Sequence, residues 1–387
     1  MNRNIAISYF LSFAKNTWFW LGIWIFYYLR FTNYAGIGII ETVLIVTATL
    51  TEIPTGAIAD VFGKKKTLIV AFLLEIIGAF IMAYAMNFNQ LVLSVFIMCV
   101  GGSFYSGTLD ALVYDSLKQD FKENKFDKVI SNIASISLIT AAICSIIGGF
   151  TYAINPRYPF ILSAVGYTLG FIATFFLNEP KIDTVKFSLK NYLFQTKQGI
   201  IQLTKDHNIK LRTLILLSIG FVTVISSEMV DSFLSFEFGF NDKQMGILWA
   251  VIFIISAIAA QTTSFFNKKL GLHKSILVTG LLMAITFIVS PYLGLILGGM
   301  SLILRSSLQS IFGNLASVSI NDSTESRFRA TTISTFNMIK NIPYVLTAFL
   351  IGSVSDLFSA KVISLYLGVF LLIMLGAGYF KQKSLRV

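Results

Sequence analysis

The sequence predicts an all-α integral membrane protein with twelve transmembrane helices, built as two six-helix bundles related by pseudo-two-fold symmetry. Three observations predict this fold class. Hydrophobic residues make up 55% of the 387 residues and charged residues only 13%, whereas soluble domains carry about 25% charged residues. The apolar residues gather in runs long enough to cross a bilayer. A stretch of the first half also returns, in altered form, in the second half.

Twelve apolar runs approach the length of about 20 residues that a membrane-crossing helix requires. The expected spans are 7–29, 36–58, 67–86, 91–114, 129–152, 159–177, 211–234, 245–266, 274–291, 293–318, 331–352 and 362–380. The longest polar segment separates the sixth span from the seventh. We therefore expect an N-terminal six-helix bundle over 1–177, a cytoplasmic inter-bundle linker over 178–210 and a C-terminal six-helix bundle over 211–387.

The basic residues indicate orientation. The chain has a net charge of +11, and its lysines and arginines lie mostly in every second loop, as in the run Lys64 to Lys66 after the second span. Because cytoplasmic loops carry an excess of Lys and Arg, both termini are expected in the cytoplasm. We expect a multi-pass protein of the inner, cytoplasmic membrane, and we read the positive charge as an orientation signal that argues against a nucleic-acid partner.

Neither cysteine chemistry nor nucleotide binding is indicated. Cys99 and Cys144 both lie in apolar runs, so no disulfide framework or metal-ligand spacing exists. The phosphate-binding pattern G-x-x-x-x-G-K-(S/T) is absent. No cofactor is expected, and ATP is not the expected energy source.

An internal repeat follows the second and eighth spans. "DVFGKKKTLIV" at 60–70 corresponds to "KKLGLHKSILV" at 268–278, with Gly63 aligned to Gly271 and an apolar helix following both. Asp60 corresponds to Lys268, so the repeat is degenerate. Internal repeats are typical of secondary transporters.

The linker allows two interpretations. Leu189, Leu193, Ile200 and Leu203 would share one face of a helix, which favours an interfacial helix that rests on the inner leaflet and ties the halves together. The alternative is a plain tether.

A motif between the second and third spans carries a family resemblance. The run Gly56-Ala-Ile-Ala-Asp60-Val-Phe-Gly63-Lys64-Lys65-Lys66 resembles the G-x-x-x-D-x-x-G-(R/K)-(R/K) signature of the major facilitator superfamily. Its position, the chain length and the six-plus-six organisation agree with that family. The resemblance implies the major facilitator fold and transport of a small molecule by alternating access.

The chemistry of this motif can be derived residue by residue. Gly56 lets neighbouring helices approach closely, and Gly63 permits the tight turn back into the membrane. Asp60 needs a lysine or a helix N-terminus as partner, and Asp115, at the end of the fourth span, is placed to pair with Lys64 or Lys65.

The resemblance implies that Asp60, Lys64 and Asp115 form a gate that locks the halves on the cytoplasmic side in the outward-facing state. The alternative is that these residues only set the topology.

Other segments resemble a bacterial efflux and permease subgroup of the same superfamily. They are "TEIPTGAIAD" at 51–60 and "SGTLDALVYDSL" at 106–117, and the segment from Arg329 to Ser334 that opens the eleventh span looks like the partner of the gate in the second half. Proton-driven drug exporters usually carry G-P-x-x-G-G in the fifth span. Here Cys144-Ser-Ile-Ile-Gly148-Gly149 keeps only the glycine pair, which weakens the case for drug/proton exchange.

Charged residues within the spans are the candidate site residues, because each ionisable group at bilayer depth costs at least about 2.5–3.5 kcal/mol. In the first half, Lys15, Glu52 and Asp110 fall in the inner half of the spans. We expect either a functional cluster of Lys15 with Glu52 and Asp110 or a structural ion pair. Pro54 should kink the second span beside Glu52.

In the second half, Arg305 is a candidate for recognising an anionic group, since guanidinium presents a fork of donors. The alternative is permanent neutralisation by Glu228 or Asp231. These two acids lie three residues apart and should share a helix face, which makes them candidates for carrying the coupling proton. The alternative is a salt-bridge network, to which Lys340 would also belong.

Two further acids receive structural interpretations. We expect Glu75 to be a packing or pairing residue and Glu41, near the outer surface, to be solvated. The first span is rich in aromatic residues, from Trp18 to Tyr28. We interpret most of these rings as lipid contacts and interface anchors.

The leading functional hypothesis is secondary active transport, coupled to protons and directed to efflux of amphipathic or toxic compounds. The alternative is proton-coupled uptake of a metabolite, such as an anion recognised by Arg305. A membrane-embedded transferase or a receptor without transport activity is remote, so no enzyme is expected. The expected partners are a small-molecule substrate, H⁺ and the lipid bilayer, and a monomer is expected.

Overall fold

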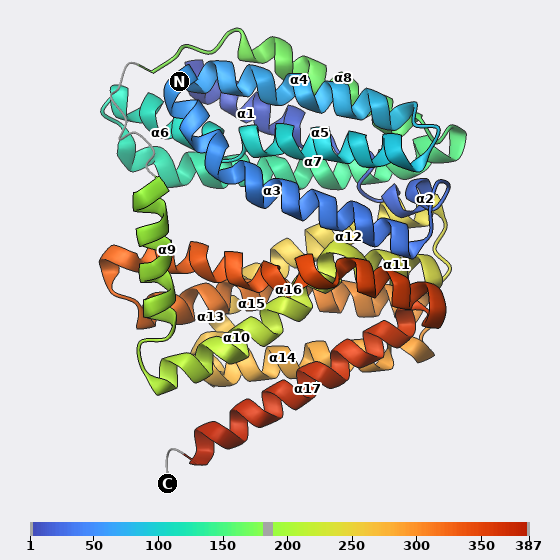
Figure 1. Cartoon of the computed structure of the whole chain (residues 1–387), viewed down its shortest axis with the longest axis vertical. Coiled ribbons are helices and arrows are strands. Elements are labelled where there is room, and N and C mark those ends of the chain that lie inside the picture. The colour runs from blue at the N-terminus through green and yellow to red at the C-terminus, as the bar shows by residue number, and fades with distance from the viewer. Residues whose placement is uncertain (1–2, 181–188, 385–387) are drawn as a thin grey trace. The chain divides into compact units, whose positions relative to one another are not determined.

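The computed structural model describes the backbone of residues 3–180 and 189–384. The side chains of residues 52–61, 189, 191, 192, 330 and 379–384 lie outside the described part. Within that part the regular structure is helical throughout, without a strand (Figure 1).

The helices of the first half follow the expected order of spans. Their bounds are α1 Arg3–Lys15, α2 Trp24–Tyr28, α3 Tyr34–Phe62, α4 Lys64–Ala83, α5 Phe88–Tyr105, α6 Thr108–Gln119, the short 3₁₀ helix Glu123–Lys125, α7 Phe126–Ile154 and α8 Tyr158–Thr174.

The second half begins with a helix in the predicted linker. Its elements are α9 Leu189–Leu203, α10 His207–Ile225, the π-helical turn Ser226–Val230, α11 Asp231–Glu237, α12 Asp242–Gln261, α13 Thr263–Leu270, α14 Leu272–Val289, the 3₁₀ turn Ser290–Tyr292, α15 Leu295–Ser323, the 3₁₀ turn Ser326–Phe328, α16 Arg329–Phe358 and α17 Ala360–Ser384.

The all-α, twelve-span fold class is confirmed. Ten stretches of the described chain are helical, long and apolar enough to cross a membrane. The sixth span is α8, an apolar helix of 17 residues, which at 1.5 Å per residue reaches about 26 Å. The remaining span is the first, and it is not one continuous helix.

The chain divides into two compact units. Unit 1 comprises Met1–Thr32, Thr42–Leu189 and Asn241–Ala250, and unit 2 comprises Asn33–Glu41, Lys190–Phe240 and Val251–Val387. The beginning of α3 therefore belongs to unit 2, and the beginning of α12 belongs to unit 1. The predicted bundle boundaries remain a prediction.

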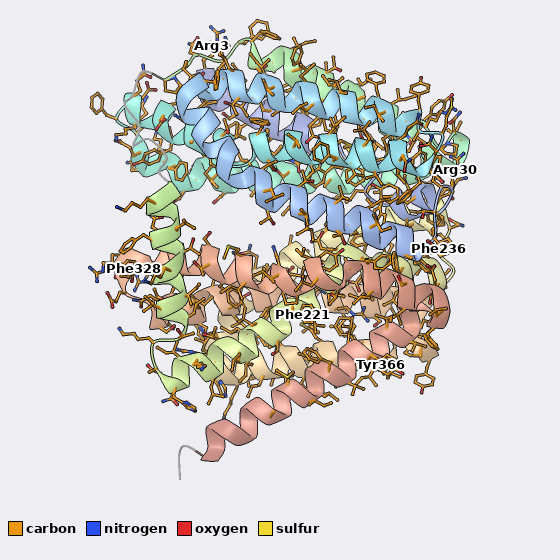
Figure 2. All side chains as sticks on the ribbon, viewed as in Figure 1. Arg3, Arg30, Phe221, Phe236, Phe328 and Tyr366 are labelled. Atoms are coloured by element: carbon orange, nitrogen blue, oxygen red, sulfur yellow. The ribbon has the colours of Figure 1, made fainter. Side chains whose placement is uncertain are left out.

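Each unit has its own apolar core. In unit 1, α4 lies between α5 and α8 (Figure 1), and Leu68, Phe72 and Tyr167 are fully buried. In unit 2, α14 runs beside α15 and α17. Phe221 of α10, labelled in Figure 2, packs edge-on against Phe370 of α17, with 6.1 Å between the ring centroids.

The first span is broken between α1 and α2, which corrects the predicted continuous helix over 7–29. After Lys15 the backbone of residues 16–23 runs through turns. The Asn16 side chain donates to the carbonyl oxygen of Ser12 at 2.8 Å and to the Ser137 hydroxyl at 2.9 Å. An amide side chain that binds a helix carbonyl competes with the backbone hydrogen bonds of the helix, so Asn16 favours the end of α1.

Glycines of α7 and α8 make room for this broken segment. A Cβ atom added to Gly148 would overlap the carbonyl oxygen of Phe19, and one added to Gly166 would overlap the side chain of Thr17. The Gly148–Gly149 pair that the sequence retains therefore has a structural reason at Gly148.

We expect Gly148→Ala to destabilise the protein by about 1–3 kcal/mol or more, because the new methyl group has no space beside Phe19. Thermal unfolding in detergent measures the effect. The matched control is Gly313→Ala in α15, where an added Cβ meets no atom within 4 Å and where alanine favours the helix. Equal melting temperatures for the two variants would contradict this packing.

Other spans are interrupted as well, among them the fourth and the seventh. The fourth span breaks between α5 and α6 at Gly107, whose φ of 73° belongs to the left-handed region that glycine adopts without strain. The seventh span contains the π-helical turn Ser226–Val230 between α10 and α11. Such turns occur frequently at functional sites.

The internal repeat has a structural counterpart. Gly63 and Gly271 have φ angles of 92° and 77°, and each directly precedes the helix that opens the next span, α4 or α14. At α4 the Glu179 carboxylate accepts from the backbone N–H groups of Lys64 and Lys65 at 2.7 and 2.8 Å. A carboxylate at this helix end is favoured by the helix dipole.

The linker contains a helix, α9, as one of the two interpretations predicts, and from residue 190 on α9 belongs to unit 2. A Cβ on Gly199 would overlap the side chain of Thr335 in α16. Beyond α9, Lys205 lies 3.3 Å from the Glu325 carboxylate, and Gln202 donates to the same oxygen at 3.4 Å. The hydrogen bond from Lys205, followed by that from Gln202, lowers the pKa of Glu325. Whether α9 lies on a membrane surface remains a prediction.

Candidate functional site

The gate motif forms an ion pair in unit 1. Lys64, at the start of α4, places its Nζ atom 2.6 Å from Oδ2 of Asp115 in α6, and each side chain is only 8% exposed. The predicted pairing of Asp115 is thus confirmed for Lys64. Lys65 instead donates to the carbonyl oxygen of Phe175 at 2.7 Å.

The other gate residues are only partly described. Gly56 and Asp60 belong to α3, but their side chains, like that of Glu52, lie outside the described part of the chain. Arg329 is the first residue of α16 and its side chain is exposed. The role of Arg329 in a gate remains a prediction.

Lys15 pairs with a different acid from the one expected. Its Nζ atom lies 2.6 Å from Oε1 of Glu75 in α4, and Glu75 is only 2% exposed. The predicted pairing with Asp110 is wrong, whereas the prediction of Glu75 as a pairing residue is confirmed. The side chain of Glu52, the other expected partner, is not described.

Aromatic rings surround this ion pair. The Lys15 ammonium lies 5.4, 5.9 and 5.7 Å from the ring centroids of Trp18, Tyr105 and Tyr167. Ring faces attract cations within about 6 Å. Part of the aromatic residues of the first span, Trp18 among them, therefore stabilises a buried charge.

Arg305 is the most completely satisfied charge of unit 2. Its Nη1 donates to Oδ1 of Asp231 at 2.6 Å, its Nη2 to the Thr286 carbonyl and the Ser290 hydroxyl at 3.0 and 2.8 Å, and its Nε to the Thr286 hydroxyl at 3.2 Å. The guanidinium also lies 3.9 Å from the Phe287 ring centroid. Arg305 has an exposed fraction of 0%, and its ion pair with Asp231 agrees with the alternative of neutralisation, while a role in recognising an anion remains a prediction.

The two acids of the seventh span lie in different surroundings, so the expected shared face is wrong. Asp231 is buried and also accepts from the Ser226 hydroxyl at 2.7 Å. Glu228 is exposed. A π-helical turn closes i→i+5 hydrogen bonds, so the turn that ends directly before Asp231 changes the angle between Glu228 and Asp231 from the one that an α-helix would give.

Glu228 and Lys340 form an open pair of opposite charges. Each lies close enough to the other for electrostatic attraction, but among the described residues no ion-pair contact within 4.0 Å joins them. The aliphatic stem of Lys340 passes over Gly220 of α10, whose added Cβ would lie 3.5 Å from it. The membership of Lys340 in one functional group with the acids of the seventh span remains a prediction.

Asp110 is the open acid of unit 1. It stands in the first turn of α6, directly after the break at Gly107, and is exposed. Among the side chains that the structure describes, no basic residue forms an ion pair with it. The helix dipole favours an acid at this position.

Glu41 is a candidate residue whose surroundings differ from those predicted from the sequence. Its exposed fraction is 6%, and its Oε2 accepts a hydrogen bond from the Tyr344 hydroxyl of α16 at 3.1 Å. The expectation that Glu41 is solvated is wrong. Tyr344 follows Lys340 by four residues, which places both on one face of α16. That spacing is the only feature of the sequence that could have indicated this pairing.

The comparisons with known proteins agree with this architecture. The family model of the Major Facilitator Superfamily matches residues 5–345. An uncharacterized MFS-type transporter, YxaM of Bacillus subtilis (strain 168), is 24% identical over 385 residues, which cover 95% of this chain and 94% of that protein.

Solved structures share the fold. The nucleoside transporter NupG superposes with a TM-score of 0.77 at 16% identity over 98% of this chain and 98% of that chain. A POT family transporter in complex with 5-aminolevulinic acid gives a TM-score of 0.74 at 14% identity over 99% and 97% of the two chains. Together with the family match over most of the sequence, these likenesses place the chain in the Major Facilitator Superfamily, as a multi-pass membrane protein of the transporter type.

Proposed function

We propose that this protein is a proton-coupled secondary transporter of the cytoplasmic membrane that exports amphipathic or toxic small molecules by alternating access. It acts as a monomer with both termini in the cytoplasm. The observation that carries the proposal is the division of its intramembrane charges into two classes. One class is satisfied internally, and the other is open to a ligand.

The satisfied class consists of the pairs Lys15–Glu75 and Asp231–Arg305. Their charges neutralise each other and leave no strong interaction for a solute. These residues therefore support the two units structurally, and we assign Lys15, Asp231 and Arg305 to the packed structure that supports the transport pathway.

The open class consists of Asp110, Glu228 and Lys340. Asp110 and Glu228 both lie at interruptions of a span, at the Gly107 break and in the π-helical turn. Interrupted helices are frequent at transporter binding sites, because they present polar groups to a cavity. We propose that these three residues contact the solute.

The Lys64–Asp115 pair serves as the gate of this mechanism. It is tied to the capped start of α4 at Gly63. In this proposal Gly56, Asp60 and Arg329 complete the gate, Glu52 adjoins the pathway, and the bundles 1–177 and 211–387 rock about the 178–210 linker.

A second candidate function is uptake of a charged metabolite. It is supported by the open Glu228–Lys340 pair, which offers an acid and a base to one ligand, and Lys340 replaces Arg305 as the anion-recognising residue. A structurally similar transporter was solved with 5-aminolevulinic acid, a molecule with an amino group and a carboxyl group.

Flux measurements test the proposal. Purified protein in proteoliposomes with an imposed pH gradient is offered fluorescent amphipathic cations, nucleosides and amino acids, and solute movement is followed in both orientations of the gradient. We expect the wild type to move one class of solute only when the gradient is present. Asp110→Asn and Glu228→Gln are expected to reduce that movement at least about tenfold, because each removes a charge that no other residue replaces.

The matched control is Asp322→Asn, which removes an exposed carboxylate near the end of α15 and should retain the wild-type flux. Wild-type rates in both site variants would refute the assignment of the open charges. Flux that ignores the pH gradient would refute proton coupling.

A further inference from the structure

The beginning of α3 is in direct backbone contact with α16 inside unit 2. A Cβ added to Gly38 would lie 2.5 Å from the carbonyl oxygen of Ala348, and one added to Gly352 would overlap the carbonyl group of Tyr34. Glycines at these two positions let the helices approach more closely than any side chain would allow. The contact is therefore specific to this pair of segments.

A carboxylate closes one end of this contact. Oδ1 and Oδ2 of Asp356, near the end of α16, accept from the backbone N–H groups of Tyr34 and Ala35, each at 2.9 Å. These N–H groups have no partner within the first turn of α3, and the helix dipole favours a negative charge there. Asp356 thus caps the start of α3.

A second carboxyl group, that of Glu41, lies inside the same contact but in different surroundings. Glu41 is buried, and its only described side-chain partner is the neutral hydroxyl of Tyr344, itself fully buried. No lysine or arginine of the described side chains forms an ion pair with Glu41. A carboxylate buried without a cation is costly, so a proton is the remaining partner that can neutralise it.

The other charged groups around Glu41 do not neutralise its carboxylate in place of that proton. Glu228, on the π-helical turn, is near enough to repel a negative charge on Glu41. Lys340, one turn before Tyr344 on α16, is attracted to Glu228. Asp356, at the other end of the contact, is a further acidic residue and is engaged by the start of α3.

We propose that Glu41 is the residue that takes up the coupling proton, and that its protonated form holds the beginning of α3 on α16. This inference deepens the proton-coupled transport proposed above and rests on it. The proton enters from water onto a carboxyl oxygen and returns to water, so no other reactant is needed. When the proton leaves, a carboxylate remains beside Tyr344 and Glu228, and the contact loosens.

Infrared difference spectroscopy tests the proton site on purified protein in lipid without any solute. A protonated carboxylic acid has its own carbonyl stretching band, which vanishes on ionisation. We expect a pH-titrating band in the wild type and in the control Glu123→Gln, an exposed residue of a short 3₁₀ helix. The band, or the part of it due to Glu41, should be absent in Glu41→Gln.

A band of full intensity in Glu41→Gln would overturn the assignment. If Glu41→Gln does not fold, Tyr344→Phe decides instead. Loss of the phenol hydrogen bond should move the Glu41 carbonyl band to higher frequency, and an unmoved band in a folded Tyr344→Phe protein would equally overturn the proposal.

Hydrogen exchange tests the link between the proton and the contact. The exchange rates are first corrected for the chemical exchange rate. Protection of the amides at the start of α3 in the wild type should then fall by up to about tenfold for each unit by which the pH rises, because one proton is linked to the contact. In Glu41→Gln, a permanently neutral mimic, protection should not depend on pH. Equal pH dependence in both proteins would refute the link.

These readouts separate the two proposals. Absence of gradient-driven flux in the wild type, with the Glu41 band still titrating, would defeat the transport proposal alone. Gradient-driven flux with no titrating Glu41 band would defeat the assignment of the proton to Glu41 alone.

Discussion

Replacing Arg305 with methionine is expected to destabilise the protein by about 3–5 kcal/mol, because removing one partner of a buried ion pair leaves the other charge uncompensated. The uncompensated group is Asp231, which is 4% exposed and keeps only the Ser226 hydroxyl as a side-chain donor among the contacts described above. The donors to Thr286 and Ser290 are lost at the same time. Thermal or chemical unfolding in detergent measures the loss.

A double variant separates the ion pair from the packing around it. Arg305→Met combined with Asp231→Leu removes both charges, and replacement of a buried pair by apolar residues is often neutral. We therefore expect the double variant to recover much of the stability lost in the single variant. Lys269→Met, at an exposed position near the end of α13, is the matched control and should behave as the wild type. A double variant that is less stable than Arg305→Met would contradict this account.

The pairing of Lys64 with Asp115 was predictable because both residues lie at the ends of spans that the sequence delimits. The motif fixes the start of α4, and the fourth span places Asp115 near the same end of unit 1. The end of a span fixes the depth of a residue in the membrane. Two residues near a loop can pair only when they lie at the same depth.

The partners of Lys15 and Glu41 depended on rotation about helix axes, which hydrophobicity does not specify in these spans. Asn4, Ser8 and Ser12 recur every four residues along α1 and are buried, but this polar stripe does not specify which acid of the neighbouring helices Lys15 faces. Glu41 was placed at the correct end of its span, yet the close glycine contact with α16 removes it from water. That contact depends on Gly38 and Gly352, which are far apart in the sequence.

The interruptions of the spans account for the remaining errors. A π-helical turn has no characteristic sequence, and the polar residues of Ser226–Val230 mark a polar site in the seventh span without indicating a widened turn. It separates Glu228 from Asp231 and so produces one open and one satisfied acid. Only Asn16 indicates the break after Lys15. Gly107 marks the other break, but glycine is also common in close-packed helices.

Replacing Lys15 with methionine is expected to release the end of α1 as well as to destabilise unit 1. Lys15 is the last residue of α1, and its ion pair with Glu75 attaches that end to α4. Without it Glu75 remains buried as an uncompensated acid, at a cost of about 3–5 kcal/mol. Hydrogen exchange of residues 16–23 should then rise at least about tenfold, while exchange in α14 and α17 should change only as far as global stability does.

The conservative variant Lys15→Arg distinguishes charge from shape. It keeps a cation near Glu75 and the surrounding rings, so the exchange of residues 16–23 should stay close to that of the wild type. Unaltered exchange in Lys15→Met would show that the turns between α1 and α2 are held by packing against Gly148 and Gly166 alone. Because those glycines already accept Phe19 and Thr17 without space to spare, the ion pair is expected to position the segment and the glycines to admit it, so that loss of either contribution opens the break in the first span.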